Sequence, residues 1–389
     1  MPFKYADRLG KLPEYLFAEL DRIKSAHIAR GEDIIDLGVG DPDTPTPQEV
    51  VEALISSSRD PANHTYPSYS GMDRFRQAAA AWFNKRFDVG LDYRKQIVSL
   101  IGSKEGIAHL PLAFVDPGDT VLYTEPGYPV YYASTVFAGG VPYALPLLPE
   151  NSFLPDLDAV PDKVLEKAKM LFINYPNNPT SATADSTFFK KVIGFAKEHR
   201  IIVAHDAAYS EIYFGEKTHS ILEYPGAQDV AIEFHSLSKT FSMTGWRIGF
   251  ACGNEGLVAG LGRVKTNIDS GVFQAVQWAG IEALSLSDRL TGPLRELYRQ
   301  RVRIVTSSLS KAGLEPFNGN STFYVWTKLP AGVDSVSFTE ALIERAGVVV
   351  SPGIGFGPSG RNYFRISVTN SDDRITEACE RIAKVIRAL

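Results

Sequence analysis

The chain has 389 residues, of which 44% are hydrophobic and 22% charged, and its formal net charge is −5. Because one hydrophobic core stops growing at about 250–300 residues, this length predicts two domains. There is no basic run of the kind that nucleic acid needs, and no apolar stretch approaches the ~20 residues of a membrane span. Two cysteines and an N-terminus without a signal-peptide segment predict a cytoplasmic protein that binds neither nucleic acid nor membrane.

Short apolar runs alternate with amphipathic segments over most of the chain. Between two of these runs, Phe189, Val192 and Ala196 recur at helical spacing. A succession of strand, helix and strand predicts right-handed crossovers and a mostly parallel sheet covered on both faces. The predicted buried strands are 97–101, 121–123, 170–173, 201–204, 230–234 and 246–251.

The C-terminal part has a different pattern, which indicates a smaller α+β domain. A long predicted helix over about 294–312 is followed by strands at 323–326, 348–350 and 364–368 and by a last amphipathic helix. The segment 15–30 is also predicted to be helical, and we expect it to pack against a neighbouring element. The predicted division is a large domain of residues 45–285 and a small domain of residues 1–44 and 286–389, which includes an N-terminal arm.

The strongest local signal is the segment Ser236-Leu237-Ser238-Lys239-Thr240, which follows a predicted strand. A lysine that forms an imine needs a defined position, some access and a lowered pKa, so that its amine can attack. The flanking hydroxyls and the guanidinium of Arg247 could bind a phosphate. The alternative is a surface lysine in a hydroxyl-rich loop, with Arg247 in a salt bridge.

Acid, phenol and amide groups follow two further strands. Asp206 comes at the end of the strand 201–204, where open α/β sheets bind ligands, and its carboxylate could keep a pyridine nitrogen protonated. Tyr209 and Asn178 could both hydrogen-bond a phenolic oxygen on such a ring, Asn178 from a rigid turn over residues 174–180. For Asp206 taken alone, a helix N-cap is the competing interpretation.

Three more segments carry candidate binding groups. In Gly102-Ser103-Lys104-Glu105-Gly106, backbone N–H groups at a helix start could bind a phosphate, although Ser103 could equally be an ordinary N-cap. Tyr128 could stack on an aromatic ring. Arg365 lies in an apolar run, where an unpaired charge is expensive, so we expect it to bind a carboxylate of a substrate or of the protein.

Together these segments resemble the class I/II aminotransferases of the aspartate aminotransferase fold, over essentially the whole chain. The motifs that carry the resemblance are Asn-Tyr-Pro-Asn-Asn-Pro-Thr, Asp206-x-x-Tyr209, Ser-x-Ser-Lys and Trp-Arg-x-Gly, in that order. The resemblance implies an α/β fold of the fold-type I pyridoxal-phosphate enzymes, with a mostly parallel, seven-stranded sheet in the large domain. It also implies pyridoxal 5'-phosphate as cofactor, no metal, and transfer of an amino group between an amino acid and a 2-oxo acid.

The resemblance also implies a role for each candidate residue. Lys239 looks like the Schiff-base lysine, Asp206 like the partner of the pyridine nitrogen, and Tyr209 like a partner of the ring oxygen. The other expected cofactor-binding residues are Tyr66, Ser103, Lys104, Tyr128, Asn178, Ser236, Ser238 and Arg247, with Tyr66 lent by the second subunit of a homodimer. The expected substrate-binding residues are Tyr15, Gly40, Lys104, Asn178, Asn267 and Arg365, with Arg365 as the clamp of the α-carboxylate.

Four stretches are similar to the branch of this family that acts on LL-2,6-diaminopimelate, namely 12–17, 100–109, 205–211 and 267–271. They predict amino transfer between LL-2,6-diaminopimelate and 2-oxoglutarate, a reaction of lysine biosynthesis. Two departures lie beside inferred catalytic groups: Ser181 stands where Gly usually follows Asn-Pro-Thr, and Thr240-Phe241-Ser242 replaces the common Pro-Tyr-Asn. They bear on the identity of the substrate more than on the class of reaction.

Other functions remain as alternatives. An aminotransferase with another substrate, or a β-lyase on the same scaffold, would keep the cofactor. A regulatory module that senses the cofactor would need a DNA-binding extension. An NAD site is disfavoured, because the Gly-dense loop 353–357 does not open a βαβ unit.

Overall fold

The computed structural model describes residues 3–13 and 16–388, and its largest sheet has seven strands in the order β2-β8-β7-β6-β5-β3-β4. Strand β8 is antiparallel to both of its neighbours, and the other adjacent strands are parallel. This confirms the α/β fold with a mostly parallel, seven-stranded sheet. The strands are β2 (Ile97–Leu100), β3 (Thr120–Glu125), β4 (Val141–Pro146), β5 (Ala168–Asn174), β6 (Ile202–Asp206), β7 (Ala231–Ser236) and β8 (Gly249–Gly253).

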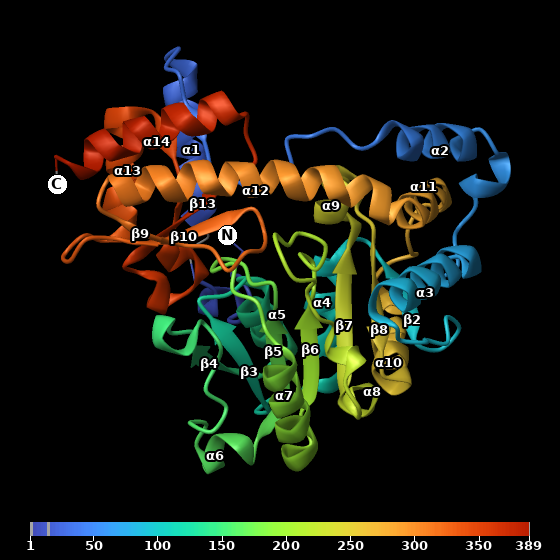
Figure 1. Ribbon diagram of the computed structural model, residues 1–389. Helices are drawn as coiled ribbons and strands as arrows, with labels where there is room; N and C mark the ends of the chain where they lie inside the picture. The colour runs from blue at the N-terminus through green and yellow to red at the C-terminus, as the bar shows by residue number, and fades with distance from the viewer. Residues whose placement is uncertain (1–2, 14–15, 389) are drawn as a thin grey trace.

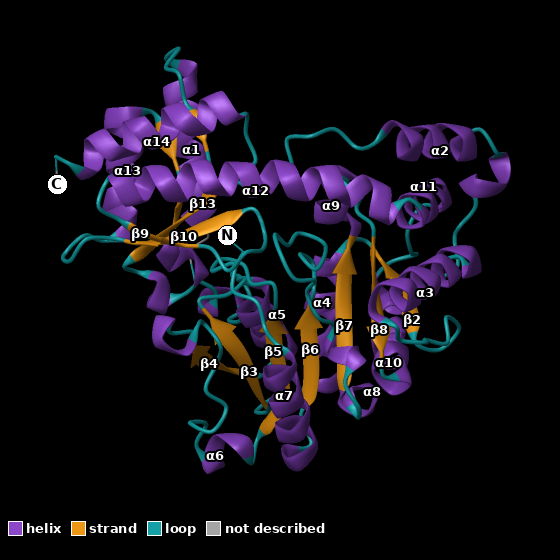
Figure 2. Cartoon of the chain, viewed as in Figure 1, coloured by secondary structure: helices purple, strands orange, loops and turns teal. Residues whose placement is uncertain are grey.

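Helices cover both faces of this sheet (Figure 1 and Figure 2). On one face, Val203 of β6 belongs to a core that includes Phe188 and Val192 of α7. On the other face, Phe234 of β7 belongs to a second core, with Ile107 of α4. The helices of this part are α2 (Gln48–Ser58), α3 (Asp73–Phe87), α4 (Ser103–Phe114), α5 (Val130–Ala138), α6 (Asp162–Leu165), α7 (Ser186–His199), α8 (Ala227–Val230), α9 (Leu237–Thr240), α10 (Glu255–Ile268) and α11 (Gln274–Ser285).

A four-stranded antiparallel sheet in the order β12-β13-β10-β9 forms the second part of the molecule. Its core includes Leu309 of the long helix, Ile366 of β13 and Ile382 of the last helix, and the long helix runs above the larger sheet as well (Figure 1). The elements are α12 (Ser287–Lys311), β9 (Glu315–Phe317), β10 (Tyr324–Lys328), α13 (Ser335–Ala346), β12 (Ser351–Pro352), β13 (Tyr363–Ser367) and α14 (Asp372–Ile386).

The N-terminal segment joins this second part. Strand β1 (Ile35–Asp36) pairs in parallel with β11 (Val348–Val349). Helix α1 (Leu16–Ala29) packs Ile23 against the small cluster of Ile343 and Val349, which confirms that this segment packs against a neighbouring element. The domain boundaries expected after residues 44 and 285 fall before α2 and at the end of α11, and they stay a prediction.

The sequence patterns missed two local features. Strand β4 was not predicted, because it is an edge strand whose two prolines weaken the strand pattern. The strand predicted over 246–251 begins only at Gly249, because Thr244–Trp246 form a 3-10 turn and Arg247 has a left-handed backbone with φ 56°. No described helix has the length and apolar character needed to cross a membrane.

Candidate active site

A cavity of about 430 Å³ lies where the carboxyl ends of β5, β6 and β7 face strands β10 and β13 of the smaller sheet. Parallel strands end at one edge of their sheet, so polar residues that follow them collect there. The cavity also receives Asp21 of α1 and Val39. The sequence-predicted residues that line it are Gly40, Ser103, Lys104, Tyr128, Asn178, Asp206, Tyr209, Ser236, Ser238, Lys239, Arg247 and Arg365.

Two of the predicted site residues that the structure describes, Tyr66 and Asn267, do not line this cavity. Tyr66 is 87% exposed and lies beside a separate surface hollow. The exposed Asn267 donates from Nδ2 to the carbonyl oxygen of Arg263 at 2.8 Å, on the same helix. Tyr15 lies outside the described residues.

Lys239 projects from the single turn of α9 and donates from Nζ to the carbonyl oxygen of Gly40 at 2.6 Å. The side-chain oxygen of Ser236 caps this turn by accepting the N–H of Ser238. Burial lowers the pKa of Lys239 to about 8, and the nearby cations Arg365 and Arg247 act in the same direction against the Asp41 carboxylate. The surface-lysine interpretation is therefore wrong, and the amine has the lowered pKa that imine chemistry needs.

Asp206 is buried at the end of β6, and no helix begins there, so the N-cap interpretation is wrong. Its Oδ2 accepts the hydroxyl of Tyr131 at 2.8 Å, and its Oδ1 accepts the N–H of Ala208 at 3.2 Å. Burial raises the pKa of Asp206, and these two hydrogen bonds oppose the rise. The sequence analysis missed Tyr131, although it follows the candidate Tyr128 by one helical turn.

Two pairs of polar side chains set the positions of Tyr209 and Asn178. The hydroxyl of Tyr209 lies 2.9 Å from that of Tyr324, which comes from β10 and was not predicted. Asn174 was also missed: its Oδ1 accepts the N–H of Asn178 at 2.8 Å, while its Nδ2 donates to the carbonyl oxygen of Asp206 at 2.7 Å. The turn after β5 is thereby tied to the end of β6.

Arg365 is buried, and no Asp or Glu of the described chain lies within ion-pairing distance of it. Its guanidinium donates to Oδ1 of Asn178 and to the carbonyl oxygen of Gly38, both at 2.7 Å, and to Ser351 Oγ at 3.1 Å. It also lies 4.0 Å from the ring centre of Tyr324. Its Nε is buried and has no hydrogen-bond partner among the described residues. A buried cation that lines a cavity without a carboxylate beside it is suited to bind the carboxylate of a ligand.

Another part of the cavity lining comes from the start of α4, Ser236, Ser238 and Arg247. Helix α4 begins at Ser103 and Gly102 is its N-cap, so Ser103 is not the cap itself. The guanidinium of Arg247 lies so close to Gly102 that a Cβ there would collide with it. A helix N-terminus, two hydroxyls and an arginine make a site for a phosphate.

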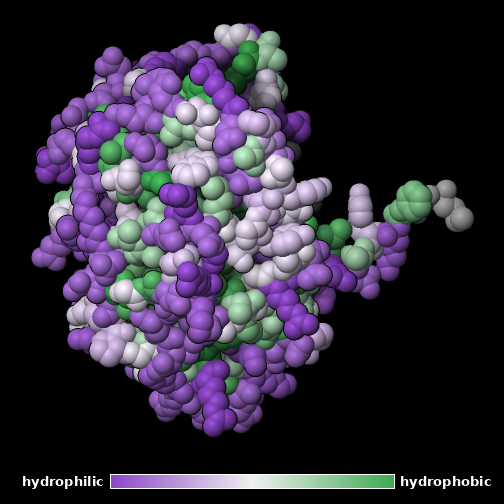
Figure 3. Space-filling model, turned by 90° about the vertical axis from the view of Figure 1, so that its right-hand side faces the viewer, coloured by the Kyte–Doolittle hydropathy of each residue, from purple (hydrophilic) through white to green (hydrophobic). Residues whose placement is uncertain are grey.

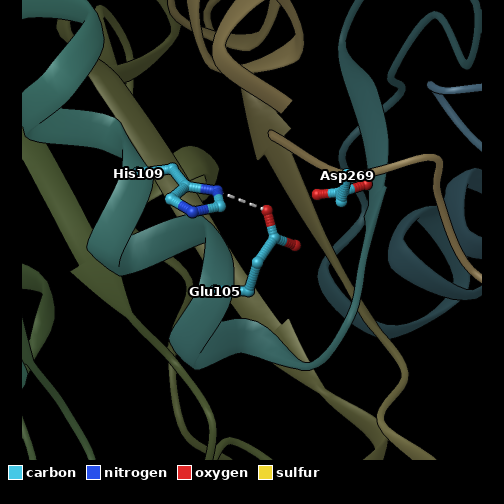
Figure 4. Close-up of side chains that lie close together, drawn as sticks. All are labelled: Glu105, His109 and Asp269. Carbon is cyan, nitrogen blue, oxygen red and sulfur yellow. Dashed lines mark hydrogen bonds and ion pairs between the residues drawn. The ribbon is translucent and has the colours of Figure 1, made fainter. Parts of the chain in front are cut away.

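Two side chains of α4, Glu105 and His109, converge with Asp269 (Figure 4). Their histidine nitrogen and carboxylate oxygen atoms lie within 4.8 Å of one another. The fully buried ammonium of Lys265 donates to Glu105 Oε2 at 2.9 Å and to Asp269 Oδ2 at 3.0 Å. His109 Nδ1 lies 2.8 Å from Glu105 Oε1. The lysine therefore supplies the cation for these carboxylates, and it ties the first turn of α4 to the segment after α10.

The family model for aminotransferase class I and II matches residues 32–382, and the chain belongs to this family. It is 58% identical over 381 residues to the LL-diaminopimelate aminotransferase of Aquifex aeolicus, a match that covers 98% of each chain. The structure superposes on substrate-bound BacF from Bacillus subtilis with a TM-score of 0.95 and 37% identity, over 99% of this chain and 98% of that one. It superposes on a probable N-succinyldiaminopimelate aminotransferase from Thermus thermophilus with a TM-score of 0.90 and 37% identity, over 95% and 99%.

The protein is thus an aminotransferase that uses pyridoxal phosphate, with an amino acid and a 2-oxo acid as substrates. The cavity fits this cofactor, because its lining combines a site for a phosphate, the buried carboxylate of Asp206 and a lysine with a lowered pKa. When bound, the cofactor supplies a ring that withdraws electrons from the α-carbon of the amino acid.

Gly102→Ala should weaken the binding of pyridoxal phosphate by about tenfold or more, because its Cβ would displace Arg247 from the phosphate site. Equilibrium dialysis of the full chain measures this affinity. Gly118→Ala is the matched control, since Gly118 also has a positive φ, of 98°, but a Cβ there meets nothing within 4 Å. Equal affinities in the two variants would show that Arg247 is not displaced or does not hold the phosphate.

Acetylation of Lys239 by acetic anhydride should rise with pH and level off above about 8, because only the neutral amine reacts and the pKa of Lys239 is lowered to about 8. Competitive labelling of the cofactor-free chain, followed by peptide mass spectrometry, measures this profile. Arg365→Met removes one of the cations that lower the pKa and should move the midpoint upward. A wild-type midpoint near the ordinary value of 10.5 would contradict the lowered pKa.

Proposed function

We propose that this aminotransferase transfers an amino group between LL-2,6-diaminopimelate and 2-oxoglutarate, as a cytoplasmic enzyme of lysine biosynthesis. The observation that carries the proposal is the 58% identity, over 98% of each chain, to a relative named for this amino donor. Other relatives with the same name are 52–55% identical over at least 98% of this chain.

The charges of the cavity suit a substrate with an amino-acid group at each end. In the proposal, the guanidinium of Arg365 binds the α-carboxylate of the reacting end. Asp21 and Lys104 also line the cavity, and they offer a carboxylate and an ammonium to the distal group. Gly40 adds backbone to this region, where a side chain would collide with Tyr324.

Each remaining group has one proposed task. Once the substrate amine has displaced Lys239 from the cofactor, its Nζ accepts the α-proton of the substrate and later gives this proton up again to form the product. Asp206 holds a protonated pyridine nitrogen. Because this carboxylate is buried, it is an effective partner for a cation. Tyr209 and Asn178 donate to the ring oxygen, and Tyr128 stacks on the ring. Ser103, Lys104, Ser236, Ser238 and Arg247 bind the phosphate.

We further propose that the enzyme is a homodimer in which Tyr66 completes the partner's phosphate site. Three exposed nonpolar side chains support this: Tyr66, Ile268 and Phe273 are 87%, 55% and 45% exposed. The N-terminal segment with Phe3 and Tyr5 extends away from the body of the molecule (Figure 3), and these side chains are 99% and 80% exposed. Large nonpolar side chains exposed in this way favour contact with another chain.

A screen of single amino acids against the cofactor-loaded enzyme tests the substrate. LL-2,6-diaminopimelate and glutamate should each abolish the cofactor's visible absorbance without a 2-oxo acid present, because each completes a half-reaction. LL-2,6-diaminopimelate should show the higher kcat/KM in this direction. No response to diaminopimelate, with a response to glutamate, would remove the proposed donor. Release of pyruvate and ammonia without an acceptor would indicate a β-lyase.

Co-expression of two defective chains tests the shared site. Lys239→Ala should be inactive, and Tyr66→Ala should lose at least about tenfold in cofactor affinity, through the loss of one charge-assisted hydrogen bond. Random pairing makes about half of the dimers mixed, and each mixed dimer holds one intact site. At a cofactor concentration that loads the wild type but leaves Tyr66→Ala mostly empty, activity should therefore return to about a quarter of the wild-type value. If the mixture is no more active than Tyr66→Ala alone, Tyr66 does not act across an interface.

A further inference from the structure

Three titratable side chains lie buried on the face of the large sheet that is turned away from the cavity. They are His205 of β6 and Glu233 and His235 of β7, with exposed fractions of 0%, 0% and 3%. Successive residues of a strand point to opposite faces, so their chain neighbours Asp206 and Ser236 face the cavity instead. Burial of charged groups on a strand costs free energy. Sequences depart from the usual apolar pattern of buried strands mainly at functional sites.

Glu233 is the centre of the cluster. Its Oε2 lies 2.8 Å from His205 Nδ1, and its Oε1 lies 2.6 Å from His235 Nε2. Oε2 also accepts the hydroxyl of Ser220 at 2.8 Å and the N–H of Ile221 at 3.1 Å. The oxygen of Ser220 accepts the N–H of Leu222 at 3.0 Å, which leaves its hydroxyl proton free to point at Glu233. A carboxylate that accepts this many hydrogen bonds is stabilised in its ionised form.

The hydrogen bonds of His205 determine its protonation state. Its Nε2 lies 3.0 Å from the carbonyl oxygen of Tyr175, which can only accept, so Nε2 carries a proton. Its Nδ1 faces the ionised carboxylate of Glu233, which also can only accept, so Nδ1 carries a proton as well. With both nitrogens protonated, the ring is an imidazolium.

The acceptor of this imidazolium belongs to the 174–180 turn, which carries Asn178 into the cavity. Asn174 ties the same turn to the backbone of Asp206, and Asn178 accepts a hydrogen bond from Arg365. The ring of Phe189 packs 5.2 Å from that of His205, and such apolar surroundings strengthen electrostatic interactions.

We propose that His205 is a positioning residue of the active site: held as an imidazolium by Glu233, it fixes the 174–180 turn, which is tied to the backbone of Asp206, from the opposite face of the sheet. The inference concerns the cofactor site of the aminotransferase, and it does not depend on which amino acid is the substrate.

Glu233→Gln tests this proposal with little change of shape. The amide can accept from His235 Nε2 and donate to His205 Nδ1, so these two contacts persist while His205 becomes neutral. The hydroxyl of Ser220 and the N–H of Ile221 lose their acceptor, and the core variant described below controls for the resulting loss of stability. In ¹⁵N spectra of the histidine rings of the holoenzyme at pH 7.5, the wild type should show His205 with both nitrogens protonated. The variant should show an unprotonated Nδ1, and it should bind pyridoxal phosphate about tenfold more weakly, because a neutral His205 loses the charge-assisted part of its hydrogen bond to the 174–180 turn. His205→Gln assigns the signal.

Two controls separate this role from general stability. Glu32→Gln alters another His–Glu pair, between His27 Nδ1 and Glu32 Oε2 at 2.7 Å near the end of α1, and it should leave the affinity unchanged. Val192→Ala opens a hole in the core on the same face as His205 and should lower the melting temperature without changing the affinity or the ring signal. A neutral His205 in the wild-type spectrum overturns the proposal. So does a Glu233→Gln affinity equal to that of Glu32→Gln, or an equal loss in Val192→Ala.

Discussion

The active site depends on one geometric constraint, namely that parallel strands end at the same edge of their sheet. Strands β5, β6 and β7 deliver Asn178, Asp206 and Lys239 to this edge from segments that lie far apart in the chain. The alternation of side chains then decides which residues face the cavity and which enter the core behind it. Asp206 and Ser236 face the cavity, while His205 and His235 do not.

The large sheet supplies only half of the site, because the smaller sheet closes the other side. The two halves meet through polar contacts: Lys239 with Gly40, Asn178 with Arg365, and Tyr209 with Tyr324. Two of these contacts, Lys239 with Gly40 and Asn178 with Arg365, join a group proposed to hold the cofactor to one in the proposed substrate site. A change in one of these contacts would therefore affect the binding of both the cofactor and the substrate, which must lie next to each other for the amino group to be transferred.

Burial of charge gives these groups their reactivity. The cations of Arg365 and Arg247 help burial to keep the amine of Lys239 partly neutral. The buried ammonium of Lys265 balances two carboxylates behind the start of α4, which would otherwise weaken the helix N-terminus as a site for a phosphate. From the other face of the sheet, His205 is proposed to hold the turn that carries Asn178 into the cavity.

The sequence by itself determined the fold class, the reaction class and most of the cavity lining, because these follow from local patterns. An apolar run followed by Asp206, or by Ser-x-Ser-Lys, carries its chemistry within a few residues. Tyr324, Tyr131 and Asn174 were missed, since each acts through a partner that only the tertiary structure brings near. The same holds for the protonation of His205, which depends on Tyr175 and Glu233, 30 and 28 residues away. The exposed Tyr66 marks the limit of a single chain, because its predicted role requires a second subunit.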